Sequence, residues 1–266
     1  MRNIKLLSTD FDGTLIGENP REACVASLAL ELEKIEGDGT FWSINTGRPL
    51  PYLLEGLEHF KSPIQPHYII TRERYLYYHD IQKGWTPLGD WNERCDLQHQ
   101  ELFEQCGLFF EKIETLVSSY HGSIIILKDD LGVPDGLVSE EEEVIYEITS
   151  QLMELPQRPK DFFFQGSGSQ KKYFLSFYHR LYNKGTTLEA LSSLLSIQAD
   201  HILAIGDHHN DLSMLHPNIA KMLACPSNAH PMVKEAVLEA GGHISLHPAG
   251  KGTAEAIALY RHGKRG

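Results

Sequence analysis

The chain has 266 residues, of which 41% are hydrophobic and 23% are charged, and its formal net charge is −12. This length suits one large or two modest globular domains. The negative charge argues against non-specific nucleic-acid binding, which needs a positive surface to displace counterions. No apolar stretch approaches the about 18 residues of a membrane span, and the four cysteines form no Cys-x-x-Cys pair. We therefore expect a cytoplasmic protein that binds neither membranes nor nucleic acid.

The first expected element is a short buried strand, predicted by the apolar run at residues 4–7. Asp10, Asp12 and Gly13 follow this strand. Open α/β sheets bind ligands beyond the carboxyl ends of their strands, and Asp10 and Asp12 lie one strand period apart, so both could face one site. The alternative is an ordinary turn, because Asp-Gly is a strong turn signal.

An amphipathic helix is expected over residues 20–35, with Pro20 in its first turn. A buried strand over 40–44 and a second helix over 49–60 follow. Thr46 lies between them, where free backbone N–H groups and a hydroxyl can bind an anion. A threonine that only caps the helix is the alternative interpretation.

Two further strands are expected over residues 67–71 and 75–78, with Arg72, Glu73 and Arg74 turning between them. The order of elements up to this point is β-α-β-α-β. This order predicts an α/β fold, in which helices pack on a parallel sheet.

Residues 82–179 have a different character, with long helices and strands suited to antiparallel pairing. The glycine-rich residues 166–169 are interpreted as a hairpin turn, because they lack the Gly-Lys-Ser/Thr ending and the following helix of a phosphate loop. The expected helices of this segment span 95–120, which Gly107 could break in two, and 139–155, which Ser139 could cap; the expected strands span 123–127, 161–164 and 173–178.

The α/β pattern resumes after residue 180, with a helix expected over 183–195. The apolar run 201–206 predicts another buried strand, and it leads into Asp207 much as the first strand leads into Asp10. The remaining expected elements are a short helix at 212–215, a strand at 219–224, a helix at 230–240, a strand at 243–246 and a helix at 251–260.

Charged and polar side chains follow several of these strands, and a parallel sheet brings strand ends to one edge. Carboxylates with few or no histidines suit Mg²⁺, and a lysine near a helix N-terminus suits the oxygens of a phosphoryl group. One carboxylate that is free to attack gives nucleophilic catalysis through an aspartyl-phosphate. The residues in question are Asp10, Asp12, Thr46, Lys184, Asp207 and Asp211.

Four motifs at these strand ends resemble those of haloacid dehalogenase superfamily phosphatases, and most closely the Cof-type and sucrose-phosphate-phosphatase-like branch. They are Asp-Phe-Asp-Gly-Thr-Leu at residues 10–15, Thr-Gly-Arg at 46–48, Asn-Lys-Gly at 183–185 and Gly-Asp-His-His-Asn-Asp at 206–211.

The resemblance implies an α/β fold with a Rossmann-like core around a central parallel sheet. Residues 1–81 and 180–266 would form this catalytic core. Residues 82–179 would form an inserted α+β cap domain that closes over the site and selects the leaving group.

The resemblance also implies roles for single residues. Asp10 would be the nucleophile and a Mg²⁺ ligand. Asp12 would be the general acid and base, with its backbone carbonyl toward the metal. Lys184 would neutralise charge between the nucleophile and the phosphoryl group. Asp207 would bind the metal, and Asp211 would either bind it or orient its water.

The substrate would be bound by Thr46, Gly47, Arg48 and Asn210. Thr46 would hydrogen-bond the transferring phosphoryl group. Asn210 would either contact phosphate or orient Lys184.

Some positions depart from the branch or are weaker candidates. Arg72 and Glu73 stand where an Asn-Gly pair often follows the third strand, which leaves substrate orientation there unspecified. His208 and His209 fill the acidic motif, and we interpret them as solvent-facing loop residues and not as metal ligands. Asn228 is a weaker site candidate, because its loop commonly lies near the metal side in the family.

Together these observations predict a Mg²⁺-dependent phosphomonoester hydrolase that acts on a small phosphorylated metabolite, with a sugar phosphate as the expected type. A phosphomutase would use the same intermediate and differ in its product. A binding protein that kept the fold and lost the reaction is a third alternative, although such a protein would usually show a broken first or acidic motif. A receiver-like phospho-acceptor would lack the cap-sized insert.

Overall fold

The computed structural model describes residues 3–17, 19, 21–128, 132–156, 158–169 and 172–263. The chain divides into two compact units. The first, which we call the core unit, comprises Met1–Asn92 and Asn183–Gly266, and the second, the inserted unit, comprises Glu93–Tyr182. No helix within the described ranges is long and apolar enough to cross a membrane.

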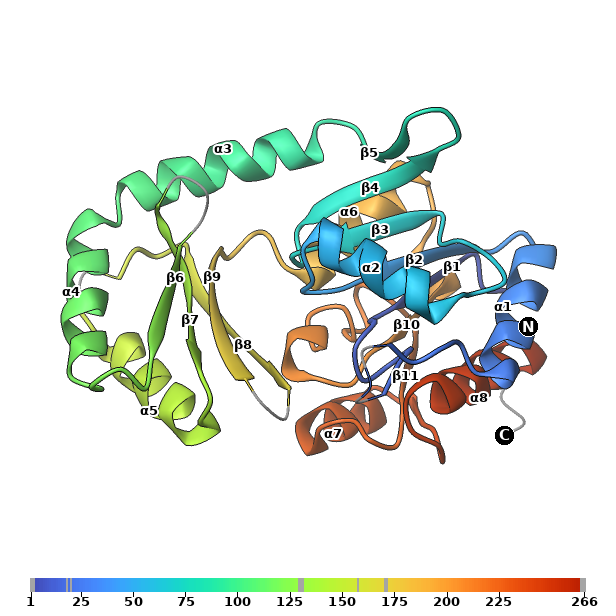
Figure 1. Ribbon diagram of the computed structural model, residues 1–266. Coiled ribbons are helices and arrows are strands. Elements are labelled where there is room, and N and C mark those ends of the chain that lie inside the picture. Colours follow the sequence, from blue (N-terminus) through green and yellow to red (C-terminus); the bar gives the residue numbers. More distant parts are fainter. Residues whose placement is uncertain are drawn as a thin grey trace. The chain divides into compact units, whose positions relative to one another are not determined.

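The core unit is built on an eight-stranded sheet, drawn in Figure 1. Its strands are parallel except at one edge, where two antiparallel strands are added. The predicted α/β fold with a central parallel sheet is therefore confirmed. In spatial order the strands are β12 (His243–Ile244), β11 (Met222–Cys225), β10 (Ile202–Ile205), β1 (Leu6–Thr9), β2 (Phe41–Asn45), β3 (Tyr68–Thr71), and the antiparallel pair β4 (Tyr75–Asp80) and β5 (Gly84–Pro87).

The first core segment was predicted to end at residue 81, but the edge strand β5 lies beyond this residue. It pairs with β4 from Tyr77 opposite Pro87 to Asp80 opposite Gly84. The core sheet therefore extends further along the chain than the β-α-β pattern alone indicates.

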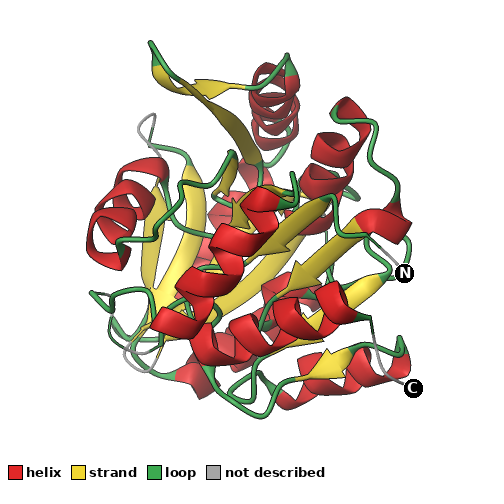
Figure 2. Cartoon of the chain, turned by 90° about the vertical axis from the view of Figure 1, so that its right-hand side faces the viewer, coloured by secondary structure: helices red, strands yellow, loops and turns green. Residues whose placement is uncertain are grey.

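Helices cover both faces of this sheet, as Figures 1 and 2 show. Neighbouring side chains of a strand point to opposite faces: Leu7 of β1 packs in the core shared with α1, α2 and α8, and Leu6 in the core shared with α6 and α7. Strands buried on both faces are mostly apolar, which is why the sequence predicts them. The helices are α1 (Ala26–Gly37), α2 (Leu50–Phe60), α6 (Lys184–Leu194), α7 (Pro231–Glu239) and α8 (Ala249–His262).

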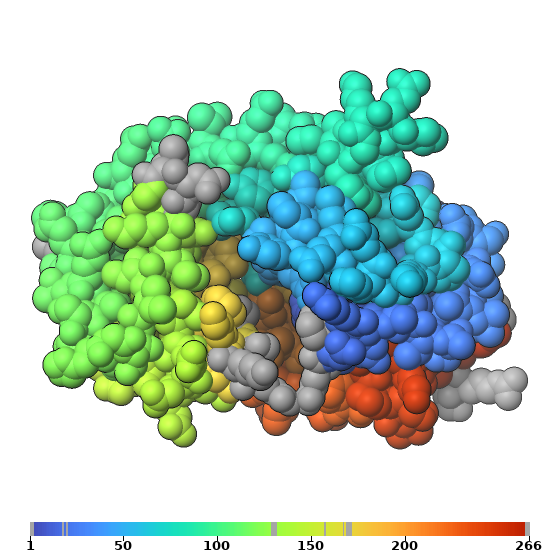
Figure 3. All heavy atoms as spheres, in the orientation of Figure 1, coloured from blue at the N-terminus to red at the C-terminus, as the bar shows by residue number. Residues whose placement is uncertain are grey.

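The two ends of the core unit lie side by side. α1 packs against α8, and the blue N-terminal and red C-terminal segments adjoin in Figure 3. Arg261 of α8 lies 2.7 Å from the Asp38 carboxylate and 3.5 Å from that of Glu31. These ion pairs join the first and last helices into one layer.

The inserted unit has its own four-stranded antiparallel sheet, in the order β6-β7-β9-β8. Its core is rich in phenylalanine, with the Phe162 ring centroid 5.2 Å from that of Phe109 and 5.3 Å from that of Phe177. The elements are α3 (Trp91–Glu104), α4 (Gly107–Ser118), β6 (Ile125–Lys128), β7 (Pro134–Ser139), α5 (Glu142–Glu154), β8 (Phe162–Ser169) and β9 (Lys172–His179).

Two of the predicted helices differ from those observed. The helix predicted over 20–35 begins only at Ala26, and Pro20 lies outside the described residues. The Cys24 N–H donates to the Phe60 carbonyl at the end of α2, at 2.6 Å, so this segment bonds to a neighbouring helix instead of starting its own. The long helix predicted over 95–120 is two helices, and the alternative of a break near Gly107 is confirmed.

Two predictions in the inserted unit are wrong. Ser139 does not cap a helix, because it ends β7 and pairs with Tyr173 of β9, and α5 begins three residues later. Residues 166–169 are not a turn, because they continue β8 as far as Ser169. A Cβ atom at Gly168 would lie 2.7 Å from the Tyr173 ring, so glycine here makes room for a cross-strand aromatic side chain.

The segment after Asp211 also differs from its prediction. Residues 212–215 form turns following a short 3₁₀ helix, η2 (His209–Asp211), and not the predicted helix. The strand predicted from residue 219 begins at Met222, because the Ile219 and Ala220 N–H groups both donate to the His216 carbonyl and form a helical turn.

Candidate active site

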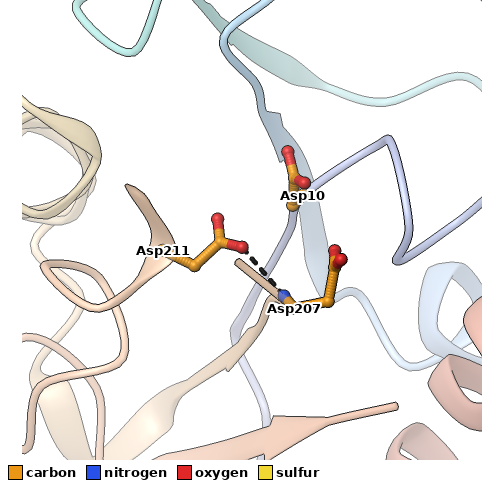
Figure 4. A group of neighbouring side chains, drawn as sticks. All are labelled: Asp10, Asp207 and Asp211. Atoms are coloured by element: carbon orange, nitrogen blue, oxygen red, sulfur yellow. Dashed lines mark hydrogen bonds between the residues drawn. The ribbon is translucent and has the colours of Figure 1, made fainter. Parts of the chain in front are cut away.

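Three aspartates gather where β1 and β10 end. Asp10 follows β1, and its N–H donates to the Ile205 carbonyl of β10, the neighbouring parallel strand, at 2.9 Å. Asp207 and Asp211 follow β10. One carboxylate oxygen from each of the three lies within 4.8 Å of the others, and Figure 4 shows the three side chains converging. The predicted meeting of strand ends is thus observed for these three acids.

Asp211 and Asp207 are fixed by hydrogen bonds within and beside their loop. Asp211 Oδ2 accepts from the backbone N–H of Asp207 at 2.8 Å, drawn as the dashed line in Figure 4, and from that of His208 at 2.9 Å. Thr14 Oγ1 donates to Asp207 Oδ1 at 2.7 Å. A Cβ atom at Gly13, whose φ is +78°, would collide with the Asp207 carboxylate. In the first motif, Gly13 therefore leaves room for the Asp207 carboxylate and Thr14 hydrogen-bonds it.

Lys184 brings a positive charge into this group of acids. Its Nζ lies 2.8 Å from Asp10 Oδ1 and 2.6 Å from Asp211 Oδ1, and its side chain is fully buried. Asn183 caps α6 by accepting from the N–H groups of Gly185 and Thr186, which sets Lys184 in the first turn. In the Asn-Lys-Gly motif, Asn183 therefore caps the helix, Lys184 supplies the positive charge, and Gly185 is small enough to pack against Ser213.

Burial and charge shift the pKa values of these groups. Burial raises the pKa of Asp10 well above its ordinary value; Lys184 opposes this, while Asp211, Asp207 and Asp12 add to it. Burial and the neighbouring Asp211 carboxylate raise the pKa of Asp207 to about 7. Burial acts to lower the pKa of Lys184, but Asp10, Asp211 and Glu73 outweigh it, so this pKa is raised.

This donor set fits a small divalent cation. Mg²⁺ prefers carboxylate oxygens, and three carboxylates from Asp10, Asp207 and Asp211 lie close enough to share one ion. Burial and the neighbouring carboxylates raise the pKa values of Asp10 and Asp207, although Lys184 opposes the rise. A bound cation would favour their ionised forms.

Asp12 is not part of this group of three carboxylates. Its carboxylate is half exposed and pairs with Arg48 through two contacts, Nε to Oδ2 at 2.7 Å and Nη2 to Oδ1 at 2.6 Å. The Arg48 guanidinium also lies over the Phe11 ring and donates to the Tyr52 carbonyl. The structure therefore pairs Asp12, which was predicted to be the general acid and base, with Arg48, which was predicted to bind substrate.

The Thr-Gly-Arg loop follows β2 beside the cluster. The Thr46 N–H donates to the Ile70 carbonyl at 2.9 Å, and Thr46 Oγ1 accepts from the Arg48 N–H at 3.2 Å. Thr46 is buried, and Asn45 before it donates through Nδ2 to the Lys184 carbonyl at 3.0 Å. Asn45 was not among the predicted site residues, although its position at a strand end is shared with Asp10.

Glu73 is the second residue that the sequence analysis did not assign to the site. It is 2% exposed, and its Oε1 accepts from Asn210 Nδ2 at 2.7 Å. Asn210 therefore contacts a carboxylate in this structure. Glu73 could have been identified from the sequence, because Arg72 and Glu73 stand where an Asn-Gly pair is often found.

The histidines of the acidic motif are half-buried, so they face solvent only in part. His208 and His209 form a cluster with His230, whose ring centroid lies 3.9 Å from that of His209 and 6.0 Å from that of His208. Burial lowers the pKa of His208. The His230 N–H donates to the Asp207 carbonyl at 2.8 Å, which joins this cluster to the acidic loop.

Asn228 connects two loops. Its Nδ2 donates to the Gly13 carbonyl at 2.8 Å, and its Oδ1 accepts from the Ala249 N–H at 2.7 Å. Its side chain therefore holds the loop after Asp12 against the start of α8.

Comparisons with known proteins agree with this geometry. A family model described as haloacid dehalogenase-like hydrolase matches residues 126–245, which include Lys184 and the acidic motif. A curated protein of Streptococcus pyogenes serotype M6, named "Putative phosphatase M6_Spy0533", is 23% identical over 80% of this chain and 84% of its own length.

Two solved structures are similar in fold. The sucrose-phosphatase from Synechocystis sp. PCC6803, solved in complex with sucrose and phosphate, has a TM-score of 0.68 at 18% identity, over 98% of each chain. A haloacid dehalogenase-like hydrolase protein from Bacillus subtilis has a TM-score of 0.62 at 16% identity, over 98% of this chain and 93% of its own. The predicted resemblance in family and fold is confirmed.

Proposed function

We propose that this protein, which is similar to haloacid dehalogenase-like hydrolases, is a Mg²⁺-dependent phosphomonoester hydrolase that acts on a small phosphorylated metabolite through an aspartyl-phosphate. The observation that carries the proposal is the buried Lys184 ammonium between Asp10 and Asp211, with Asp207 beside them. Phosphoryl transfer requires alignment and charge neutralisation above all, and this arrangement supplies both.

Asp10, Asp207 and Asp211 would hold the cation, which would offset the negative charge of the carboxylates and of the phosphoryl oxygens. Asp10 attacks phosphorus, the bond from phosphorus to the ester oxygen breaks, and Asp12 gives a proton to that oxygen. Asp12 then takes a proton from a water molecule that attacks the aspartyl-phosphate, the bond between Asp10 and phosphorus breaks, and inorganic phosphate leaves. Lys184 stays charged throughout and neutralises the nucleophile and the transferred group.

Arg48 limits when Asp12 can take part. Both Asp12 oxygens accept from the Arg48 guanidinium in this structure. Asp12 can therefore reach a leaving oxygen only after at least one of these contacts is given up. We expect the pair to open when substrate enters.

The proposed substrate is a sugar phosphate. The support is the fold similarity to the sucrose-phosphatase solved with sucrose and phosphate.

The test is phosphate release from a panel of sugar phosphates and nucleotides, with Mg²⁺ or with EDTA, in the wild type and in Asp10→Asn. We expect Mg²⁺-dependent release that Asp10→Asn reduces by at least about 10⁴-fold, because it removes the nucleophile. Release that survives in Asp10→Asn would disprove the assigned nucleophile. Rearranged esters without free phosphate would indicate a phosphomutase instead.

A further inference from the structure

Glu73 lies in a backbone conformation that its residue type disfavours. It is a central residue of the turn between β3 and β4, which the Arg74 N–H closes by donating to the Thr71 carbonyl at 3.1 Å. The φ angles of Arg72 and Glu73 are +48° and +62°. Turns with two positive φ angles favour Asn and Gly, because other side chains are strained there. A strained residue that persists beside a reaction centre suggests a function for its side chain.

The strained turn directs the Glu73 side chain into the phosphoryl site. The Glu73 N–H donates to the Thr46 carbonyl at 3.0 Å, which holds the turn against the loop after β2. A Cβ atom at Gly47 would lie 3.3 Å from Glu73 Oε1 and 4.0 Å from Asn210 Nδ2. Gly47 therefore leaves room for this carboxylate and for the amide bound to it.

The carboxylate determines the orientation of the Asn210 side chain. An ionised carboxylate only accepts hydrogen bonds, so it selects the amino end of the amide, and Asn210 Nδ2 donates to Oε1 at 2.7 Å. Asn210 is 7% exposed, and its Oδ1 is a buried atom without a hydrogen-bond partner in the structure. Without Glu73, nothing in these contacts would stop the amide from reversing.

We propose that Glu73 is a positioning residue of the phosphoryl site, which turns the amino end of Asn210 toward the Thr46–Gly47 loop. The second N–H of that amino group is then available to the oxygens of a phosphoryl group bound at the loop. This inference rests on the proposed function, since it assumes that phosphate binds at this loop.

The test compares Glu73→Gln, Glu73→Gly and Arg72→Gly with the wild type in the presence of Mg²⁺. The readouts are kcat and KM for p-nitrophenyl phosphate, the affinity for inorganic phosphate by calorimetry, and the midpoint of thermal unfolding. Arg72→Gly is the matched control, because it relieves the same turn and keeps the carboxylate.

We expect Glu73→Gly to lower kcat/KM and phosphate affinity by about 10-fold, the effect of losing one oriented hydrogen bond. Glu73→Gln should lower them less, because its amide oxygen can still accept from Asn210 but no longer selects one orientation. Glu73→Gly should at the same time raise the unfolding midpoint by about 2 °C, because glycine removes the strain of a positive φ. Arg72→Gly should keep kcat/KM within about twofold of the wild type. A loss of activity together with a gain of stability would not arise from a merely structural role.

Wild-type kcat/KM and phosphate affinity in both Glu73 variants would overturn the inference and leave the proposed function intact. An equal loss in Arg72→Gly would also overturn it, because the turn and not the carboxylate would then be responsible. A wild type that binds phosphate with Glu73-dependent affinity but shows no turnover would overturn the proposed function alone. A wild type that neither binds phosphate nor turns over substrate would overturn both.

Discussion

The core unit and the inserted unit bury different kinds of side chain. At the edge of its sheet the core unit buries Asp10, Asp211, Lys184 and Glu73. The inserted unit buries a cluster of phenylalanines, and no aspartate, glutamate, lysine or arginine is buried among its described residues. The first set is held together by ion pairs and hydrogen bonds, and the second by removal of apolar surface from water. The difference indicates where this molecule carries out its chemistry.

Loss of the Lys184 ammonium group should have the largest effect. Lys184→Ala leaves Asp10 and Asp211 buried without their ammonium, and we expect it to lower the free energy of unfolding by about 3–5 kcal/mol. Turnover should fall by at least about 10³-fold, because the charge on the transferred group is no longer neutralised. Urea unfolding and phosphate release measure the two effects. A Lys184→Ala protein of wild-type stability would show that the ion-pair cluster does not support the core.

Removal of one ring should test the apolar core of the inserted unit. Phe162 is 2% exposed and its neighbour Phe163 is 46% exposed. We expect Phe162→Leu to lower the free energy of unfolding by about 1–2 kcal/mol, because it loses ring contacts and leaves a small cavity. Phe163→Leu is the matched control and should change it by less than about 0.5 kcal/mol. Equal effects in urea unfolding would contradict the difference in burial.

The pH dependence of stability should reveal the crowded carboxylates. The pKa of Asp207 is raised to about 7 in the folded protein, so between pH 4 and 7 the folded state binds a proton that the unfolded state has lost. Stability without metal should therefore fall as pH rises through this window, by up to about 1.4 kcal/mol per pH unit for one group.

Asp207→Asn provides the comparison for this effect, because other groups also titrate in the same window. The wild type should lose more stability than Asp207→Asn between pH 4 and 7, and Mg²⁺ should reduce the difference. Identical pH profiles in urea unfolding of the two proteins without metal would contradict the assigned pKa shift.

Most of the core fold could be predicted from the sequence, because a strand that is buried on both faces is mostly apolar. The runs before Asp10 and Asp207 show this, and each is a strand in the structure. Helix starts were less predictable. α1 begins late because Cys24 bonds to α2, a contact between segments far apart in the sequence.

In the site as well, some contacts could be predicted from the sequence and others could not. The order of strand ends and polar residues was sufficient to predict that Asp10, Asp207 and Asp211 meet, since parallel strands bring their carboxyl ends to one edge. Lys184 joins them from the first turn of α6, as the resemblance of the Asn-Lys-Gly motif implied. Only the tertiary structure decided that Asp12 turns to Arg48 and that Glu73 reaches Asn210. These contacts join loops 36 and 137 residues apart, and they depend on turn geometry and burial, which local sequence patterns do not encode.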